Sequence, residues 1–253
     1  MAHPVWGGLM WQLDTTNPEV LDHLESVART LRSIGYPYLK LDFTFSPGAD
    51  GLYLDPTKTP AQRVRAGYEA IRRGAGDDAF ILACGAPLGA VVGVVDAMRI
   101  GPDVAPSWEA GPHESLLPGL EAAGPATRHA WNSTLLRSFM HRRLWLNDPD
   151  CVMLRQRETD LTAAQARAWA LAVGMSGGLA LVSDDLALLD NDAHALLEET
   201  ISFGRAADTE SSAGRTPVCD DLLSPAGPSI LTAAGRRLTA DPANPHPTLE
   251  NIT

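Results

Sequence analysis

Short apolar runs alternate along most of the chain with segments whose apolar residues recur at helical spacing. The clearest strand is the continuous apolar run from Ala79 to Cys84, a pattern typical of a strand buried on both faces. The clearest helix begins at Asn17-Pro18-Glu19, with a capping residue and a proline at the first helical position, and stops at Gly35. The predicted strands are 36–43, 79–84, 97–100, 143–146 and 179–182, and the predicted helices are about 18–34, 60–73, 126–141, 163–177 and 190–203.

This alternation of strands and helices predicts an α/β fold with a parallel sheet and right-handed crossovers. We expect residues 1–203 to form a (β/α) barrel of the TIM type that is incomplete, because five strand–helix units are visible and a closed barrel needs eight. From residue 204 the chain becomes polar and rich in serine. Val218 to Leu231 predicts a short β-rich remnant, and the tail from Asp241 is expected to be poorly ordered.

Composition narrows the class of protein. The chain has 253 residues, of which 45% are apolar, enough for one barrel-sized domain with a substantial core. It carries 31 acidic and 20 basic residues, a formal net charge of -11, with no cluster of basic residues interleaved with aromatics. Nucleic acid is therefore not an expected partner. No uninterrupted apolar stretch approaches membrane-spanning length, so we expect no membrane association.

Cysteine and histidine usage gives no sign of a metal centre. Cys84, Cys151 and Cys219 are odd in number and widely spaced, which fits neither a disulfide framework nor a zinc site. The seven histidines show no metal-ligand spacing. Because reduced thiols are typical of the cytoplasm and no signal peptide is visible at the N-terminus, we expect a cytoplasmic protein without a metal.

Candidate chemistry lies at the ends of the predicted strands. Period-two spacing puts Lys40 and Asp42 on the same face of the strand 36–43, where the chain turns into a loop. Polar residues end four successive strands: Lys40 with Asp42, Cys84, Arg99 with Asp103, and Asp148 with Asp150. Because all strands of a parallel barrel point the same way, these ends converge on one face, which is where barrel enzymes place their active sites.

Each of these residues also has an ordinary structural interpretation. Cys84 can be a small core residue, and Arg99 with Asp103 can be a surface ion pair. Asp148 lies in a sequence with turn chemistry, and Asp184-Asp185 can cap a helix. Trp11 and Trp108 can stack on a sugar ring or simply pack in the protein.

The strand-end motifs resemble those of a known family. They are Tyr38-Leu39-Lys40-Leu41-Asp42-Phe43, Cys84-Gly85-Ala86-Pro87-Leu88, Arg99-Ile100-Gly101-Pro102-Asp103 with Ser107-Trp108, and Asn147-Asp148-Pro149-Asp150. In this order they resemble the motifs of melibiase-type α-galactosidases, glycoside hydrolase family 36 and its relative family 27. The resemblance implies a retaining enzyme that cleaves terminal α-galactosides on a (β/α) barrel and uses no cofactor.

The resemblance also assigns roles position by position. It implies Asp42 as nucleophile, Asp103 as acid/base, and Lys40, Cys84, Arg99 and Asp150 as residues of the sugar pocket. These residue types suit the reaction, because a retaining glycosidase needs one ionised carboxylate to attack the anomeric carbon and a second carboxyl to transfer protons. Lys40 would stabilise the ionised Asp42, and an apolar loop near Trp108 would favour a protonated Asp103.

The sequence departs from the family at both ends. It begins at what resembles the loop after the third barrel strand, and the C-terminal β-domain is reduced to a remnant. Three alternatives therefore stay open: an active enzyme on α-galactosides, an enzyme on N-acetylgalactosaminides, and a catalytically silent relative that binds sugar weakly or serves as an assembly partner. Because incomplete barrels leave sheet edges exposed, we expect a homo-oligomer.

Overall fold

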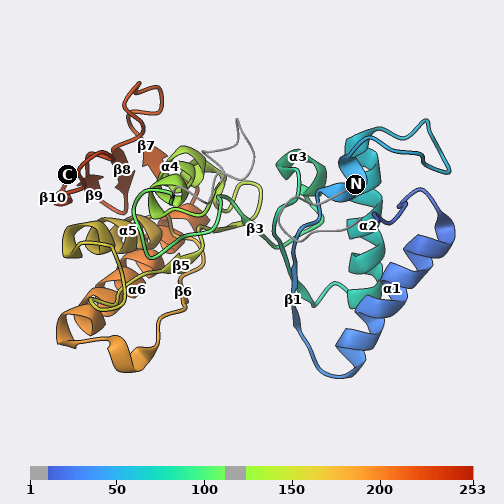
Figure 1. The fold of residues 1–253 in the computed structure, drawn as a ribbon, viewed down its shortest axis with the longest axis horizontal. Coiled ribbons are helices and arrows are strands. Elements are labelled where there is room, and N and C mark those ends of the chain that lie inside the picture. The colour runs from blue at the N-terminus through green and yellow to red at the C-terminus, as the bar shows by residue number, and fades with distance from the viewer. Residues whose placement is uncertain (1–10, 112–123, 253) are drawn as a thin grey trace. The chain divides into compact units, whose positions relative to one another are not determined.

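The computed structural model describes residues 11–111 and 124–252. The chain forms two compact units, Met1–Arg99 and Ile100–Thr253 (Figure 1). Each unit has its own strands and helices, and each is described by itself below. In the described parts of both, no helix combines the length and the apolar character needed to cross a membrane.

The first unit contains a parallel sheet with strands in the order β1 (Tyr38–Leu41), β2 (Phe80–Ala83) and β3 (Ala97–Arg99). Leu39 lies opposite Ile81, and Leu82 lies opposite Ala97. All three strands were predicted, and their parallel pairing is confirmed. Their carboxyl ends lie at the same edge of the sheet, as the strand-end motifs require.

Helices α1 (Pro18–Ser33) and α2 (Pro60–Ala75) pack side by side in this unit (Figure 1). The asparagine before α1 caps that helix as predicted, and Thr59 and Gln62 form a capping box at the start of α2. The two helices approach so closely that a Cβ on Gly74 would lie 2.0 Å from the carbonyl oxygen of Glu25. Short helices η1 (Ser46–Gly48) and α3 (Leu88–Val91) follow the ends of β1 and β2.

The second unit begins with α4 (Thr127–Arg137), η3 (Ser138–Met140), β4 (Leu146–Asp148), β5 (Cys151–Val152), α5 (Ala163–Met175), β6 (Leu181–Val182), η4 (Leu186–Leu188) and α6 (Asn191–Ser212). β5 pairs with β6 in parallel, and α5 packs against α6. The strand predicted at 143–146 begins only at Leu146, because Arg142 donates a backbone hydrogen bond to the Trp145 carbonyl and closes a turn. The core of this unit surrounds Trp131 and Trp169.

The last part of the chain is more ordered than the sequence predicts. α6 runs to Ser212 rather than ending near residue 203, because Phe203, Ala207 and Ser211 continue its buried face at helical spacing. Strands β7 (Val218–Cys219), β8 (Ile230–Ala233), β9 (Arg236–Thr239) and β10 (Thr248–Asn251) then form an antiparallel sheet in the order β10-β9-β8-β7. The predicted tail therefore contributes a strand, since β10 pairs with β9 along its full length.

The predicted barrel is present only in part. The described residues contain parallel strands in both units and helices between them, which is the arrangement of consecutive (β/α) units. No closed barrel forms within the described ranges, and the C-terminal sheet is antiparallel. The α/β class is therefore confirmed.

A buried histidine ties α6 to the turn before β4. His141 is 1% exposed, and its Nε2 lies 2.8 Å from Asp208 Oδ1. Its Nδ1 accepts from the backbone N–H of Asn147, so the ring proton is on Nε2 and is donated to Asp208. Arg142 binds the same carboxylate through two hydrogen bonds. Burial lowers the pKa of His141 below its ordinary value of 6.5, although the Asp208 hydrogen bond opposes this.

This burial makes stability depend on pH. Because the pKa of His141 is lower in the folded state, the unfolded chain binds more protons below pH 6.5, and the free energy of unfolding is expected to fall as the pH drops from 6.5 toward 5. Urea unfolding measured across this range should show the loss in the wild type and a flatter profile in His141→Gln. His194→Gln, at an exposed position, should keep the wild-type profile. Parallel profiles for His141→Gln and the wild type would contradict this account.

Candidate active site

The carboxyl end of β1 presents Lys40 and Asp42 on one face. Leu39 between Tyr38 and Lys40 is buried, whereas Tyr38, Lys40 and Asp42 are exposed, which is the predicted alternation. Asp42 Oδ1 accepts a 2.8 Å hydrogen bond from the backbone N–H of Phe43. Phe43 has φ of 53°, a left-handed conformation rare for a bulky residue, and it turns the chain out of the strand at the carboxylate.

Cys84 lies at the end of β2, directly beside this turn. Its backbone N–H donates to the carbonyl of Leu41 at 2.7 Å, and its thiol is hydrogen-bonded to Asp42. Burial, followed by the bond to Asp42, raises the pKa of Cys84 to about 12. The thiol is therefore neutral at physiological pH and acts as a hydrogen-bond donor to the carboxylate rather than as a nucleophile.

Two cations complete this cluster in the first unit. Lys40 and Arg99 both interact electrostatically with Cys84, and both lower its pKa against the larger effect of burial. Arg99 ends β3 and is 7% exposed. The structure thus brings together Lys40, Asp42, Cys84 and Arg99, four of the residues that the sequence selects, at one edge of the sheet.

The second unit holds the remaining acidic residues. Asp150 is 5% exposed and has φ of 88°, a left-handed conformation between β4 and β5. Its Oδ2 accepts from the backbone N–H of Val104 at 2.9 Å, so Asp150 holds the loop that carries Asp103. Asp148 is fully buried and accepts from the N–H of Asp150 at 2.9 Å, which is the turn-forming role that the sequence suggests.

The exposure of Asp103, Trp108 and Trp11 bears on the roles that the sequence suggests for them. Asp103 itself is exposed, so it does not lie in the apolar environment that the sequence predicts. Trp108 is 4% exposed, packs against Trp131 and donates its indole N–H to the carbonyl of Pro242 at 2.8 Å. These contacts favour the packing interpretation of Trp108 over stacking on a sugar ring. Trp11 is 88% exposed, so its ring is free to stack and its role stays a prediction.

Asp184 is a buried carboxylate for which the sequence predicted only a capping role, together with Asp185. It follows β6, is 8% exposed, and its Oδ2 accepts from the backbone N–H groups of Leu154 and Arg155 at 2.6 and 3.2 Å. The neighbouring Asp185 is the residue that caps η4. The position of Asp184 directly after a predicted strand was the available signal, as it was for Asp42 and Asp150.

Comparison with solved structures bears on this arrangement. α-Galactosidase TtGalA from Thermus thermophilus, in complex with stachyose, matches 78% of this chain at 32% identity with a TM-score of 0.65. In complex with p-nitrophenyl α-D-galactopyranoside it matches 93% of the chain at 28% identity with a TM-score of 0.69. α-Galactosidase I from Mortierella vinacea matches 90% of the chain at 15% identity and a TM-score of 0.61, which is a likeness of fold. The chain has an α-galactosidase-type fold.

The match covers only part of those enzymes. The chain spans 41% and 43% of the length of the two TtGalA structures and 55% of the Mortierella enzyme. No protein-family profile matches the chain. The α-galactosidase-type fold agrees with the strand-end motifs, because both depend on the same succession of parallel strands.

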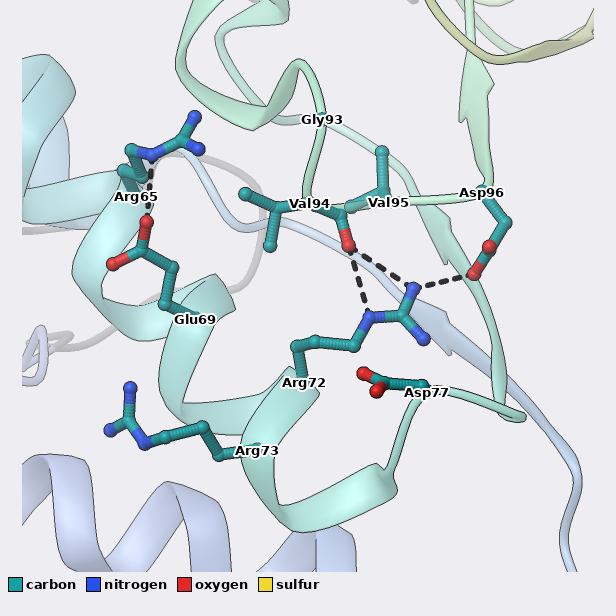
Figure 2. A pocket seen from close by; sticks show the side chains of 9 residues that line it. All are labelled: Arg65, Glu69, Arg72, Arg73, Asp77, Gly93, Val94, Val95 and Asp96. Atoms are coloured by element: carbon teal, nitrogen blue, oxygen red, sulfur yellow. Dashed lines mark hydrogen bonds and ion pairs between the residues drawn. The ribbon is translucent and has the colours of Figure 1, made fainter.

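A groove in the first unit lies away from the polar strand ends. It has a volume of about 540 Å³ and is lined by residues of α2 and of the segment before β3 (Figure 2). Its central side chain, Arg72, donates to the carbonyls of Val94 and Ala79 and to Asp96 Oδ2. Asp96 also accepts from the N–H of Ile81 at 2.7 Å. These bonds fasten α2 to the amino ends of β2 and β3, so in the α-galactosidase-type fold this groove is a structural feature.

Proposed function

We propose that the protein is a retaining glycoside hydrolase of family 36 that cleaves terminal α-D-galactosyl residues from small or oligosaccharide substrates. The observation that supports this most is the cluster of Lys40, Asp42, Cys84 and Arg99 at the carboxyl edge of β1, β2 and β3, formed by motifs that resemble this family. Sequence identity of 32% with TtGalA over most of the chain adds support. That enzyme's structures hold stachyose and p-nitrophenyl α-D-galactopyranoside, and we extend this substrate class to the present chain.

The mechanism that fits these residues is double displacement. Asp42 attacks the anomeric carbon, and a galactosyl ester of its carboxylate forms as the leaving oxygen departs. Asp103 donates a proton to that oxygen and then removes one from the water that hydrolyses the ester, so that each step is assisted by the same carboxyl. The thiol of Cys84, held protonated, orients Asp42, because it donates a hydrogen bond to the carboxylate.

The sugar hydroxyls need charged and polar partners near these two carboxyls. Lys40 is exposed and lies two residues before Asp42. Within the described residues it forms no ion pair, so its ammonium group can donate to a sugar hydroxyl. Arg99 is the second cation of the cluster, and its burial fixes the guanidinium. In the second unit Asp150 holds the loop of Asp103 through Val104, and we propose that it also contributes to the sugar pocket.

Hydrolysis of an aryl α-galactoside by the purified chain tests the proposal. We expect release of the aryl group from p-nitrophenyl α-galactoside and none from the β-anomer, and we expect NMR of the first product to show α-galactose, the retained anomer. Parallel assays with p-nitrophenyl N-acetyl-α-galactosaminide decide between the two sugars. Absence of release from both α-glycosides would reject the enzymatic proposal for this chain.

A second candidate function is weak sugar binding without catalysis. Because the chain spans less than half of TtGalA, part of the binding energy used for catalysis in a complete enzyme can be missing. Such a chain would bind galactose weakly without turning substrate over. Calorimetry with galactose beside the hydrolysis assay separates the two candidates, since binding without turnover favours the second.

We also propose that the protein self-associates. Large apolar side chains are exposed on the first unit: Ile34 (65%), Tyr36 (56%), Phe45 (44%), Leu52 (101%) and Leu54 (67%). Burial of these side chains against another chain would remove their apolar surface from water, which is the basis of the proposal. Light scattering after size exclusion should give a mass above 27.0 kDa, and a monodisperse monomer would contradict this proposal.

A further inference from the structure

The hydroxyl of Tyr68 reaches the end of β1 from the inner face of α2. Tyr68 is 3% exposed and follows Val64 by one helical turn on the buried face of the helix. Its hydroxyl lies 2.5 Å from Thr44 Oγ1, two residues beyond Asp42. A buried tyrosine hydroxyl normally finds a partner, and this one finds it in the turn that carries the proposed nucleophile.

The hydrogen bonds in this region have a defined direction. Thr44 Oγ1 donates its single proton to the carbonyl oxygen of Cys84 at 3.2 Å. Tyr68 must therefore be the donor in its bond to Thr44, because the threonine hydroxyl has no second proton to give. The result is a chain from the Tyr68 hydroxyl to the Thr44 hydroxyl to the Cys84 carbonyl, which we call the Tyr68 hydrogen-bond chain.

The Tyr68 hydrogen-bond chain adds a connection between the ends of β1 and β2. Cys84 bonds to the segment 41–44 through its N–H to Leu41, its thiol to Asp42 and its carbonyl to Thr44. Gly85 packs against the same turn: a Cβ on this residue would lie 3.4 Å from the backbone of Phe43 and 3.8 Å from Asp42 Oδ1. Burial raises the pKa of Tyr68 to about 12, and the charges of Cys84 and Asp42 act in the same direction, so the hydroxyl keeps its proton and can donate it.

We propose that Tyr68 and Thr44 are positioning residues that fix the turn of residues 42–44 against Cys84 and thereby set the direction of the Asp42 carboxylate. Asp42 and Phe43 are exposed residues, and the left-handed turn at Phe43 is strained. Neither feature holds the turn in place by itself. The Tyr68 hydrogen-bond chain supplies the restraint from the buried face of α2, which is how precise geometry is maintained beneath a reactive group. This inference rests on the proposed function of Asp42.

Thiol reactivity tests the positioning independently of catalysis. Residues 74–99 form a tryptic peptide in which Cys84 is the sole cysteine, so its alkylation by iodoacetamide at pH 8.5 is measured by mass spectrometry. Tyr68→Phe and Thr44→Val remove the two hydroxyls and keep the volume of the side chains. Each is expected to raise the alkylation rate of Cys84 by about fivefold or more, because a loosened turn uncovers the thiol.

Tyr53→Phe is the matched control in the same unit. The Tyr53 hydroxyl donates to the carbonyl of Ala49 at 2.6 Å and makes no contact with Asp42 or Cys84. It should leave the Cys84 rate unchanged. Cys219 in the second unit reports global opening, and its rate should stay constant in every variant. Equal Cys84 rates in Tyr68→Phe and Tyr53→Phe, or a parallel rise at Cys219, would overturn the inference.

The kinetic part of the test depends on activity. With p-nitrophenyl α-galactoside, Tyr68→Phe and Thr44→Val should each lower kcat about tenfold with KM changed less than about twofold, because a misdirected carboxylate affects the chemical step more than binding. The double variant should be no worse than either single one. An unchanged kcat overturns the positioning role. An inactive wild type would instead reject the proposed function, and the thiol measurement would still decide whether Tyr68 restrains the turn.

Discussion

Asp42→Asn is expected to lower kcat for p-nitrophenyl α-galactoside by about 10³-fold or more, since a retaining glycosidase cannot form its covalent intermediate without the attacking carboxylate. Asparagine keeps the size of the side chain and its acceptor for the Phe43 N–H, so the turn should survive the substitution. Asp50→Asn is the matched control, because Asp50 is an exposed aspartate in the loop that follows the same strand. It should retain wild-type kcat.

A chemical rescue separates a nucleophile from a residue that only supports the site. In Asp42→Gly, azide can enter the space of the missing carboxylate and attack the anomeric carbon directly. This single displacement inverts the sugar, so the product should be β-galactosyl azide, formed at a rate that rises with azide concentration. Activity in Asp42→Asn equal to that of Asp50→Asn, or an α-azide from the glycine variant, would refute the role proposed for Asp42.

Asp103→Ala should impair substrates according to their leaving groups. A general acid typically contributes about 10²- to 10⁴-fold, and that contribution is needed most when the departing oxygen is strongly basic. We therefore expect kcat/KM for stachyose to fall by about 10³-fold. The loss for p-nitrophenyl α-galactoside should be at least about tenfold smaller, because p-nitrophenolate leaves with little protonation.

The control for Asp103 lies in the same loop. Glu109 is an exposed acid whose ion pair with Arg128 is at the surface, and such pairs contribute little to stability. Glu109→Gln should leave both substrates unaffected. Equal losses on stachyose and on the aryl substrate in Asp103→Ala would show that Asp103 is not the acid, whatever the size of the loss.

The strand-end residues were predictable because strand direction and side-chain alternation are local properties. Lys40 and Asp42 share a face by period-two spacing, and Cys84 ends a continuous apolar run. These three positions could therefore be predicted without a structure. Trp108 was not predictable, because its indole N–H bonds to Pro242, far away in the sequence. An aromatic residue beside a motif has the same local pattern whether it packs in the core or faces a ligand.

The sequence by itself determined the succession of strands and helices, the cap at Asn17, and the placement of polar residues at strand ends. All of these depend on contacts between residues close in sequence or on the direction of a single strand. Tertiary structure alone decided which of these residues are buried, which way Asp150 points, and that Tyr68 reaches Thr44. It also extended α6 and paired β10 with β9. Burial and pairing depend on which distant segments meet, and that information resides in the packed chain as a whole.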